Sequence, residues 1–305
     1  MVVRFVEPSQ EDTMSIVRTR ELVVTPLTGT IGARIDGVDA ARPLSAESLA
    51  FLQQALYDYR VLFLPEQDLT YKQQIAFGAA WGELLPAHQF VPGMADYPHI
   101  QDNDSARQRG AAGWHTDHTF VEEVPAVTIL LSRVVPERGG DTMWADLVSA
   151  YDALSAPLQR LASSLIAVHD PFKQFSGFLR PDADPGLRQG LMELSPVRQP
   201  LVRVDPATSR PSLLINPECL SHIEGMEPAQ SDDLLDLLTR HVLVPERTVR
   251  WHWSPGDLAV WSNPTVLHKV VHDFGSQRRV TQRVMVRGPR LVGPDGIHSQ
   301  AIRND

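Results

Sequence analysis

The sequence predicts a mainly β fold with flanking helices, arranged as a single domain over residues 21–305. Beyond residue 125 most segments are short, rich in β-branched and aromatic residues, and separated by Gly and Pro turn signals. Helical periodicity is confined to a few stretches. The chain has no internal repeat or low-complexity tract, and 305 residues suffice to bury one substantial core.

The first segments combine an extension, short strands and a helix. Residues 1–20 have no apolar run or small-residue cleavage site, so they predict a poorly ordered extension rather than a signal peptide. Residues 21–39 mix β-branched residues with Gly and Thr, which is typical of short strands joined by turns. Ser45 then opens a predicted helix through Tyr59, in which leucines recur at helical spacing.

Two further helices are predicted in the N-terminal half. Residues 61–65 form a short apolar run that ends in proline and predicts a buried strand. Thr70 and Gln73 have the spacing of a capping box, which predicts a helix through about Trp81. Another helix is expected around residues 146–163.

The remaining pattern is mostly that of strands. Strand-like segments stand at residues 126–135, 212–216, 248–253, 257–262 and 278–286. Residues 170–200 differ, because they carry five prolines and little periodicity. A loop of this length is often a functional lid, and a surface excursion is the alternative.

Composition excludes several classes of protein. The chain is 43% hydrophobic and 21% charged, as in soluble globular proteins, and no run reaches the length of a transmembrane helix. A net charge of −9 argues against a nucleic-acid-binding surface. Cys219 is the only cysteine, which excludes an intramolecular disulfide and fits a reducing cytoplasm. Neither nucleic acid nor a membrane is therefore expected as a partner.

Residues 114–120, WHTDHTF, contain two histidines and an aspartate. On an extended strand, His115 and Asp117 would share one face and His118 would point away. With 11 histidines and 37 acidic residues, a His-x-acid triplet is expected about 1.3 times by chance. A second one does begin at His222. The stretch alone therefore does not distinguish a metal site from a polar strand.

Two arginines near the C-terminus are also candidates for a site. If residues 278–286 form a strand, Arg279 and Arg283 lie on the same face. If that face is internal, each guanidinium must be paired with an anion, which favours bidentate recognition of small anionic ligands. A solvent-facing strand with ordinary salt bridges is the alternative.

Taken together, His115, Asp117 and His268 are the ligand set of the facial triad of non-haem Fe(II) oxygenases. Such a triad leaves three coordination positions open. Two can chelate a 2-oxoacid and the third can take dioxygen. A cation must then neutralise the far carboxylate of 2-oxoglutarate, and Arg279 follows His268 by eleven residues.

Several longer motifs share one order and spacing. They stand at residues 32–39, 61–70, 114–120, 139–155, 249–268 and 273–283. Between about residue 21 and residue 290, the chain resembles the taurine dioxygenase / 2,4-dichlorophenoxyacetate dioxygenase family of Fe(II)/2-oxoglutarate-dependent oxygenases. The resemblance implies a double-stranded β-helix (jelly-roll, cupin-like) core.

The resemblance also implies roles for individual residues. The iron ligands fall on His115, Asp117 and His268. Arg279 and Thr142 fall where the family holds the distal carboxylate of 2-oxoglutarate. The implied cofactors are Fe(II), 2-oxoglutarate and O2, and homo-oligomers (dimers or tetramers) are common in the family.

Substrate residues follow from the same resemblance. Arg283 and His88 fall where the family holds an anionic head group, and His118 is a third candidate. The implied activity is hydroxylation of a small sulfonate, sulfate ester or carboxylate, with release of succinate and CO2. Where the oxidised carbon bears a heteroatom, the hydroxylated product collapses.

Two departures put the substrate in doubt. The stretch WSNP has Ser262 where the family often has an acid, and His118 replaces a small or apolar residue. Oxidation of a secondary metabolite or amino-acid-like substrate is therefore an alternative. A metal-dependent hydrolase would not need Arg279, and a catalytically inactive anion-binding jelly roll would not need an intact triad.

Overall fold

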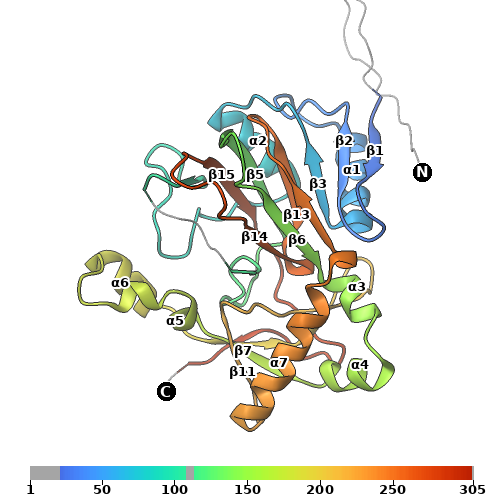
Figure 1. Cartoon of the computed structure of the whole chain (residues 1–305), viewed down its shortest axis with the longest axis vertical. Coiled ribbons are helices and arrows are strands. Elements are labelled where there is room, and N and C mark those ends of the chain that lie inside the picture. Colours follow the sequence, from blue (N-terminus) through green and yellow to red (C-terminus); the bar gives the residue numbers. More distant parts are fainter. Residues whose placement is uncertain (1–20, 108–112, 304–305) are drawn as a thin grey trace, which may run out of the picture.

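Strands form the centre of the molecule and helices lie at its periphery (Figure 1). The computed structural model describes residues 21–107 and 113–303, so the predicted extension of residues 1–20 lies outside the described residues. The predicted mainly β fold with flanking helices is confirmed. In the described part of the chain, no helix is both long and apolar enough to cross a membrane.

A seven-stranded sheet forms one side of the core. Its strands, in spatial order, are β1 (Val23–Pro26), β2 (Ala33–Asp36), β3 (Val61–Leu64), β13 (Leu258–Ser262), β5 (Val127–Val134), β15 (Val280–Val286) and β4 (Gln101–Asp104). Only the β2–β3 pair is parallel among these strands. Strands distant in sequence are thus neighbours, and β5 lies between β13 and β15.

A three-stranded sheet packs against the inner face of the large sheet. Its strands, in spatial order, are β12 (Thr248–Trp251), β6 (Thr142–Asp146) and β14 (Val266–Val270). Trp144 of β6 contacts Phe63 of β3 and Trp261 of β13, with ring centroids 5.2 and 5.7 Å apart. Two sheets that enclose an aromatic layer fit the expected double-stranded β-helix.

Two helices cover the outer face of the large sheet, and both begin where the sequence predicts. The Ser45 side chain accepts a hydrogen bond from the Ser48 backbone at the start of α1 (Ala46–Tyr59). Thr70 and Gln73 form the predicted capping box at the start of α2 (Tyr71–Trp81). Strand β3 is buried on both faces, which explains its unbroken run of apolar residues.

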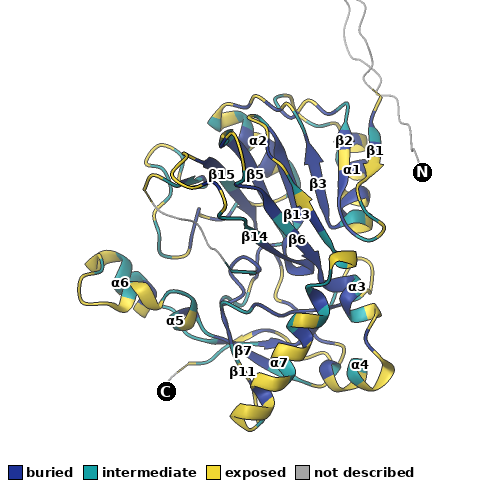
Figure 2. Ribbon diagram, in the orientation of Figure 1, coloured by how far each residue is buried: buried dark blue, intermediate teal, exposed yellow. Residues whose placement is uncertain are grey.

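A second group of elements lies on the other side of β6 and β14 (Figures 1 and 2). It contains β7 (Ile166–His169), β8 (Val197–Pro200), β9 (Val202–Val204), β10 (Pro211–Leu213), β11 (Leu220–Ile223), β16 (Gln300–Ala301), α3 (Leu147–Asp152), α4 (Ala156–Ser163) and α7 (Pro228–Val242). Ala145 and Leu267 of the small sheet belong to the same buried cluster as this group. The small sheet therefore has apolar contacts on both faces.

These elements differ from the sequence expectations in several places. The single helix expected at 146–163 is two helices: the backbone is extended at Ser155, the N-cap of α4, and Pro157 in the first turn of α4 lacks the N–H that an unbroken helix would need. The strand expected at 212–216 ends at Leu213. Helix α7 was not predicted, although Leu234 and Leu238 have helical spacing.

Residues 170–200 are not an irregular loop. They form α5 (Pro171–Gln174), η1 (Ser176–Leu179), α6 (Pro185–Met192) and β8. The side chains of Asp170 and Asp184 cap the two α-helices, and a proline follows each cap at the first helical position. The prolines therefore mark helix starts. In Figure 2 the helices of this arm are exposed or partly buried, and whether the arm closes over the site stays a prediction.

Candidate active site

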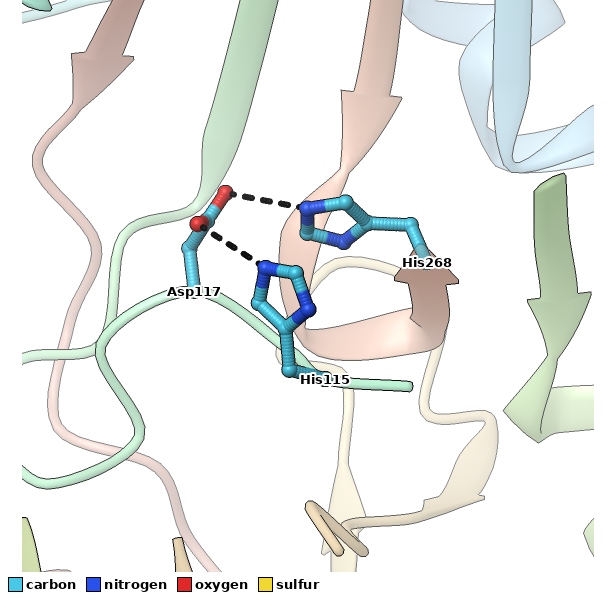
Figure 3. A group of neighbouring side chains, drawn as sticks. All are labelled: His115, Asp117 and His268. Atoms are coloured by element: carbon cyan, nitrogen blue, oxygen red, sulfur yellow. Dashed lines mark ion pairs between the residues drawn. The ribbon is translucent and has the colours of Figure 1, made fainter. Parts of the chain in front are cut away.

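Three buried side chains converge between the two sheets in the way the sequence predicts. One potential ligand atom from each of His115, Asp117 and His268 lies within 4.8 Å of the other two. His115 Nε2 is 4.0 Å from Asp117 Oδ1, and His268 Nε2 is 3.8 Å from Asp117 Oδ2 (Figure 3). Two imidazoles and one carboxylate thus face a common point, which is the donor set of a facial metal site.

Backbone pairing brings the two histidines together although 153 positions separate them in the sequence. His115 donates its backbone N–H to His268, and His268 donates to His115, with N···O distances of 3.0 and 2.7 Å. His268 lies on β14, whose pairing with β6 fixes its position in the small sheet. This reciprocal bridge places the two imidazoles with ring centroids 4.2 Å apart.

Asn263 holds the aspartate in place and was not recognised from the sequence. Its side-chain oxygen accepts the Asp117 backbone N–H at 2.9 Å, and its amide nitrogen donates to the carbonyls of Asp117 and Pro125 at 2.9 and 3.1 Å. Thr128 donates to Asp117 Oδ2 at 3.1 Å. The sequence signal for this role was the position of Asn263 in WSNP, directly after Ser262.

The hydrogen bonds and charges around the three groups suit a metal. His115 Nδ1 lies 3.0 Å from the Gly113 carbonyl and donates to it, so Nε2 is the nitrogen that faces Asp117. Burial lowers the pKa of His268 to about 3, which keeps its imidazole neutral. Burial of Asp117 acts to raise its pKa, but the positive charge of Arg283 outweighs this and holds the pKa of Asp117 below its usual range. Neutral imidazoles and an ionised carboxylate are the forms that bind metal.

The expected orientation of His118 was wrong. Residues 114–120 do not form a strand, and a turn begins at Asp117. His118 has a φ of 52°, in the left-handed region, so the alternation of an extended strand does not apply. Its side chain consequently lines the same cavity as His115 and Asp117.

Arg279 and Thr142 lie together at another wall of this cavity, as predicted. Arg279 donates through Nε to the Gly140 carbonyl at 2.8 Å and through Nη2 to Thr142 Oγ1 at 3.2 Å. Arg279 is 7% exposed, and among residues 21–107 and 113–303 no carboxylate forms an ion pair with it. Burial lowers its pKa to about 10. A buried guanidinium without a carboxylate partner is a site for an anion.

Arg283 faces the same cavity, so the two arginines do share an internal side. Its guanidinium donates to Asp117 Oδ1 and to Gln101 Oε1. His88, the predicted head-group histidine, also lines the cavity, and burial lowers its pKa to about 3. The cavity encloses about 370 Å³, which suits a small-molecule ligand. The second His-x-acid triplet is elsewhere, with His222 exposed on β11.

Comparison with known proteins places this site in a family. Residues 24–286 match the family described as "Taurine catabolism dioxygenase TauD, TfdA family". The chain belongs to the TauD/TfdA family. The resemblance found in the sequence is therefore confirmed, and the match covers every residue of the candidate site.

Individual TauD/TfdA relatives agree over most of their length. An alpha-ketoglutarate-dependent sulfate ester dioxygenase from Pseudomonas putida is 38% identical, over 93% of this chain and 95% of the relative. An (S)-phenoxypropionate/alpha-ketoglutarate-dioxygenase from Sphingobium herbicidovorans is 34% identical, over 87% of this chain and 94% of the relative. The crystal structure of a taurine dioxygenase from Burkholderia xenovorans superposes with a TM-score of 0.80 at 34% identity, covering 93% of this chain and 97% of that one.

Family membership defines both the fold and the class of reaction. The core is the jelly roll of TauD-type dioxygenases. The chain is an alpha-ketoglutarate-dependent dioxygenase, which uses 2-oxoglutarate and O2 as co-substrates. The hydrolase and the inactive anion-binding protein considered from the sequence are not supported.

Proposed function

We propose that this chain hydroxylates a small substrate with an anionic head group, using Fe(II) bound by His115, Asp117 and His268. The observation that carries the proposal is that this triad and two inward-facing arginines, Arg279 and Arg283, line one cavity. In a chain of net charge −9, two internal guanidinium groups support two anionic ligands, since Arg279 has no carboxylate partner among the described residues and Arg283 pairs there only with the metal ligand Asp117. One is 2-oxoglutarate and the other is the substrate.

Fe(II) suits the donors that the triad offers. Two imidazoles and one carboxylate leave room for further ligands, as non-haem iron oxygenases require. When bound, iron and 2-oxoglutarate supply the oxidising chemistry, in which O2 is consumed, 2-oxoglutarate yields succinate and CO2, and a substrate C–H becomes C–OH. The protein orients both ligands and excludes water.

Arg279 and Thr142 would hold the distal carboxylate of 2-oxoglutarate. The Gly140 carbonyl fixes Arg279 Nε, which leaves the Nη groups to donate to an anion. Thr142 Oγ1 accepts hydrogen bonds from both Arg279 and Trp253, so its own proton is free to be donated to the same carboxylate. A charged fork and a hydroxyl together satisfy a carboxylate that has been removed from water.

Arg283 and His88 would bind the head group of the substrate. The relatives support an anion here, since they include enzymes named for sulfate esters, phenoxypropionate and taurine. If the hydroxylated carbon bears the ester or sulfonate group, the product collapses and releases that group. A secondary metabolite or amino-acid-like substrate remains the alternative, because Ser262 and His118 depart from the common pattern.

Anaerobic spectroscopy and product analysis test this proposal. Fe(II) and 2-oxoglutarate added without oxygen should give a weak visible absorption band. Succinate should then form with O2 in the presence of a suitable sulfate ester, sulfonate or carboxylate. Folded protein without the band would contradict the site, and a band without substrate-dependent succinate would contradict only the substrate class.

Three further properties stay proposals. We expect a cytoplasmic protein, for which the single buried Cys219 is the support. We also expect a homo-oligomer, which size-exclusion chromatography with light scattering would measure. Limited proteolysis of the 170–200 arm with and without ligands would test its closure.

A further inference from the structure

His118 is a buried polar side chain for which the fold provides no hydrogen-bond partner. The residue is 3% exposed and lies among aromatic rings, with His88 at 4.6 Å and Phe120 at 5.3 Å between centroids. Neither ring nitrogen has a partner among the described residues. No other side chain in residues 21–107 and 113–303 has two buried nitrogens that both lack a partner. Such atoms are costly to bury unless a ligand satisfies them.

A second buried histidine shows how the fold treats an imidazole that has only a structural role. His169 is fully buried, its Nδ1 lies 2.8 Å from Thr119 Oγ1, and only its Nε2 lacks a partner among the described residues. Asn216 donates to the same hydroxyl at 2.8 Å and to the Thr116 carbonyl at 2.9 Å. His169 thus belongs to a polar network behind the turn, whereas His118 lines the cavity on its other side.

The groups around His118 present donors to the cavity. The Phe90 backbone N–H donates to His88 Nδ1 at 3.4 Å, which leaves the proton of His88 on Nε2. Arg283 lines the same cavity and has only donors to offer. An imidazole always carries at least one N–H, so His118 can add another donor. A ligand that accepts from all three groups is an anion with several oxygens.

The directions of these donors differ from one another. The planar guanidinium of Arg283 matches two oxygens that lie in one plane, as in a carboxylate. The rings of His88 and His118 are inclined at 78°, so their N–H groups lie in different planes. A head group with three terminal oxygens around a tetrahedral centre can use donors from several planes, and a planar carboxylate cannot use them equally well.

We propose that His118 is a specificity-determining residue, whose imidazole donates a hydrogen bond to a head group with three terminal oxygens. The enzyme therefore favours sulfate esters and sulfonates over carboxylates of the same chain length. This inference rests on the proposed function, because it assumes that the head group binds at Arg283. It assigns the preference among anions to one residue of this chain.

Matched substrates and matched variants test the inference. Hexyl sulfate, hexanesulfonate and heptanoate carry the same alkyl chain with different head groups. His118→Gln and His118→Met have similar shapes, and only Gln can donate a hydrogen bond. We expect the ratio of kcat/KM for the sulfate or sulfonate to that for the carboxylate to fall roughly tenfold to hundredfold in His118→Met, mainly through KM. His118→Gln should restore most of it.

Controls separate this role from a structural one. His169→Met removes a buried imidazole that does not line the cavity, and it should leave the ratio unchanged. The anaerobic band reports in each variant that iron and 2-oxoglutarate still bind. If His118→Met gives no band, the comparison is repeated with His118→Leu and His118→Asn, since Asn tolerates left-handed backbone.

The outcomes are distinguishable. A ratio that changes less than about twofold in His118→Met, or a wild type that prefers heptanoate, overturns the role of His118 and leaves the proposed function intact. A wild type that forms the band but turns over none of the three anions overturns both the role and the substrate class. A fall in the ratio that Gln reverses supports the inference.

Discussion

Replacing Arg279 should greatly weaken the binding of 2-oxoglutarate without weakening the fold. Arg279 is almost fully buried, and its described partners are the Gly140 carbonyl and the Thr142 hydroxyl rather than a carboxylate. Without ligand, therefore, burial of its charge is poorly compensated, as its lowered pKa also indicates. Arg279→Gln should consequently be at least as stable as the wild type in the ligand-free state.

The loss of ligand affinity should be large. Removing one partner of a buried ion pair typically costs about 3–5 kcal/mol, which corresponds to roughly two to four orders of magnitude in Kd. Thr142→Val removes a hydrogen bond to a charged carboxylate, worth about 1.5–3 kcal/mol, or roughly tenfold to hundredfold in Kd. The rise in Kd for Thr142→Val should lie near the upper end of this range, because Trp253 and Arg279 both lose the hydroxyl oxygen that accepts their hydrogen bonds. Arg279→Lys should fall between the two, since it keeps the charge and loses the fork.

Two measurements decide the outcome. Anaerobic titration of the Fe(II)-loaded protein with 2-oxoglutarate, followed through the visible band, gives Kd for each variant. Urea denaturation of the ligand-free protein gives the free energy of unfolding. If Arg279→Gln binds 2-oxoglutarate within about fivefold of the wild type, the assignment of Arg279 is refuted. If it instead loses more than about 2 kcal/mol of stability, Arg279 is part of a structural ion pair.

Three further changes have defined outcomes. Asn263→Ala should lower the free energy of unfolding by about 2–3 kcal/mol and weaken Fe(II) binding, because it removes both hydrogen bonds to the Asp117 backbone. Urea denaturation would measure the stability and metal titration the Fe(II) affinity. Unchanged values of both would contradict this role of Asn263. Burial lowers the pKa of His169 from 6.5 to about 3. As the pH falls from 6.5 towards 3, His169 is therefore protonated in the unfolded chain but not in the folded one, and the free energy of unfolding decreases. His169→Gln should therefore reduce the pH slope of stability by up to about 1.4 kcal/mol per pH unit below pH 6.5, and an unaltered slope would show that the folded imidazole is already protonated. Arg283→Gln should raise KM for anionic substrates at least about tenfold, and an equal rise for an uncharged substrate of similar size would argue against a head-group contact.

Local signals in the sequence were sufficient for the N-terminal helices and for the composition of the site. The capping box at Thr70 depends only on residues within one helical turn, so the start of α2 could be predicted to the residue. The ligand types at positions 115, 117 and 268 and the arginine at 279 could also be recognised. Their convergence could not be derived from spacing, because it depends on strand pairing between segments 153 residues apart.

Pairing between distant segments also explains which elements were missed. Strand β7 is only four residues long, and it is a strand because β8 and β11 lie on either side of it. Such short strands carry little periodicity of their own. In the 170–200 arm the prolines fit a loop from the sequence alone, but a proline after a capping aspartate is equally typical of a helix start.

The orientation of His118 shows why a pattern of alternation can fail next to an active site. Alternation holds only where the backbone is extended, and the left-handed φ at His118 ends the extended segment directly after Asp117. That turn is held from outside, since Asn263 bonds the backbone of Asp117 and Gln199 donates to the carbonyl of Thr119 at 2.8 Å. Asn263 and Gln199 are both far from this turn in the sequence, so no local sequence pattern predicts it. The same contacts keep a polar side chain without a fold partner inside the cavity, which is the arrangement expected if its partner is the substrate.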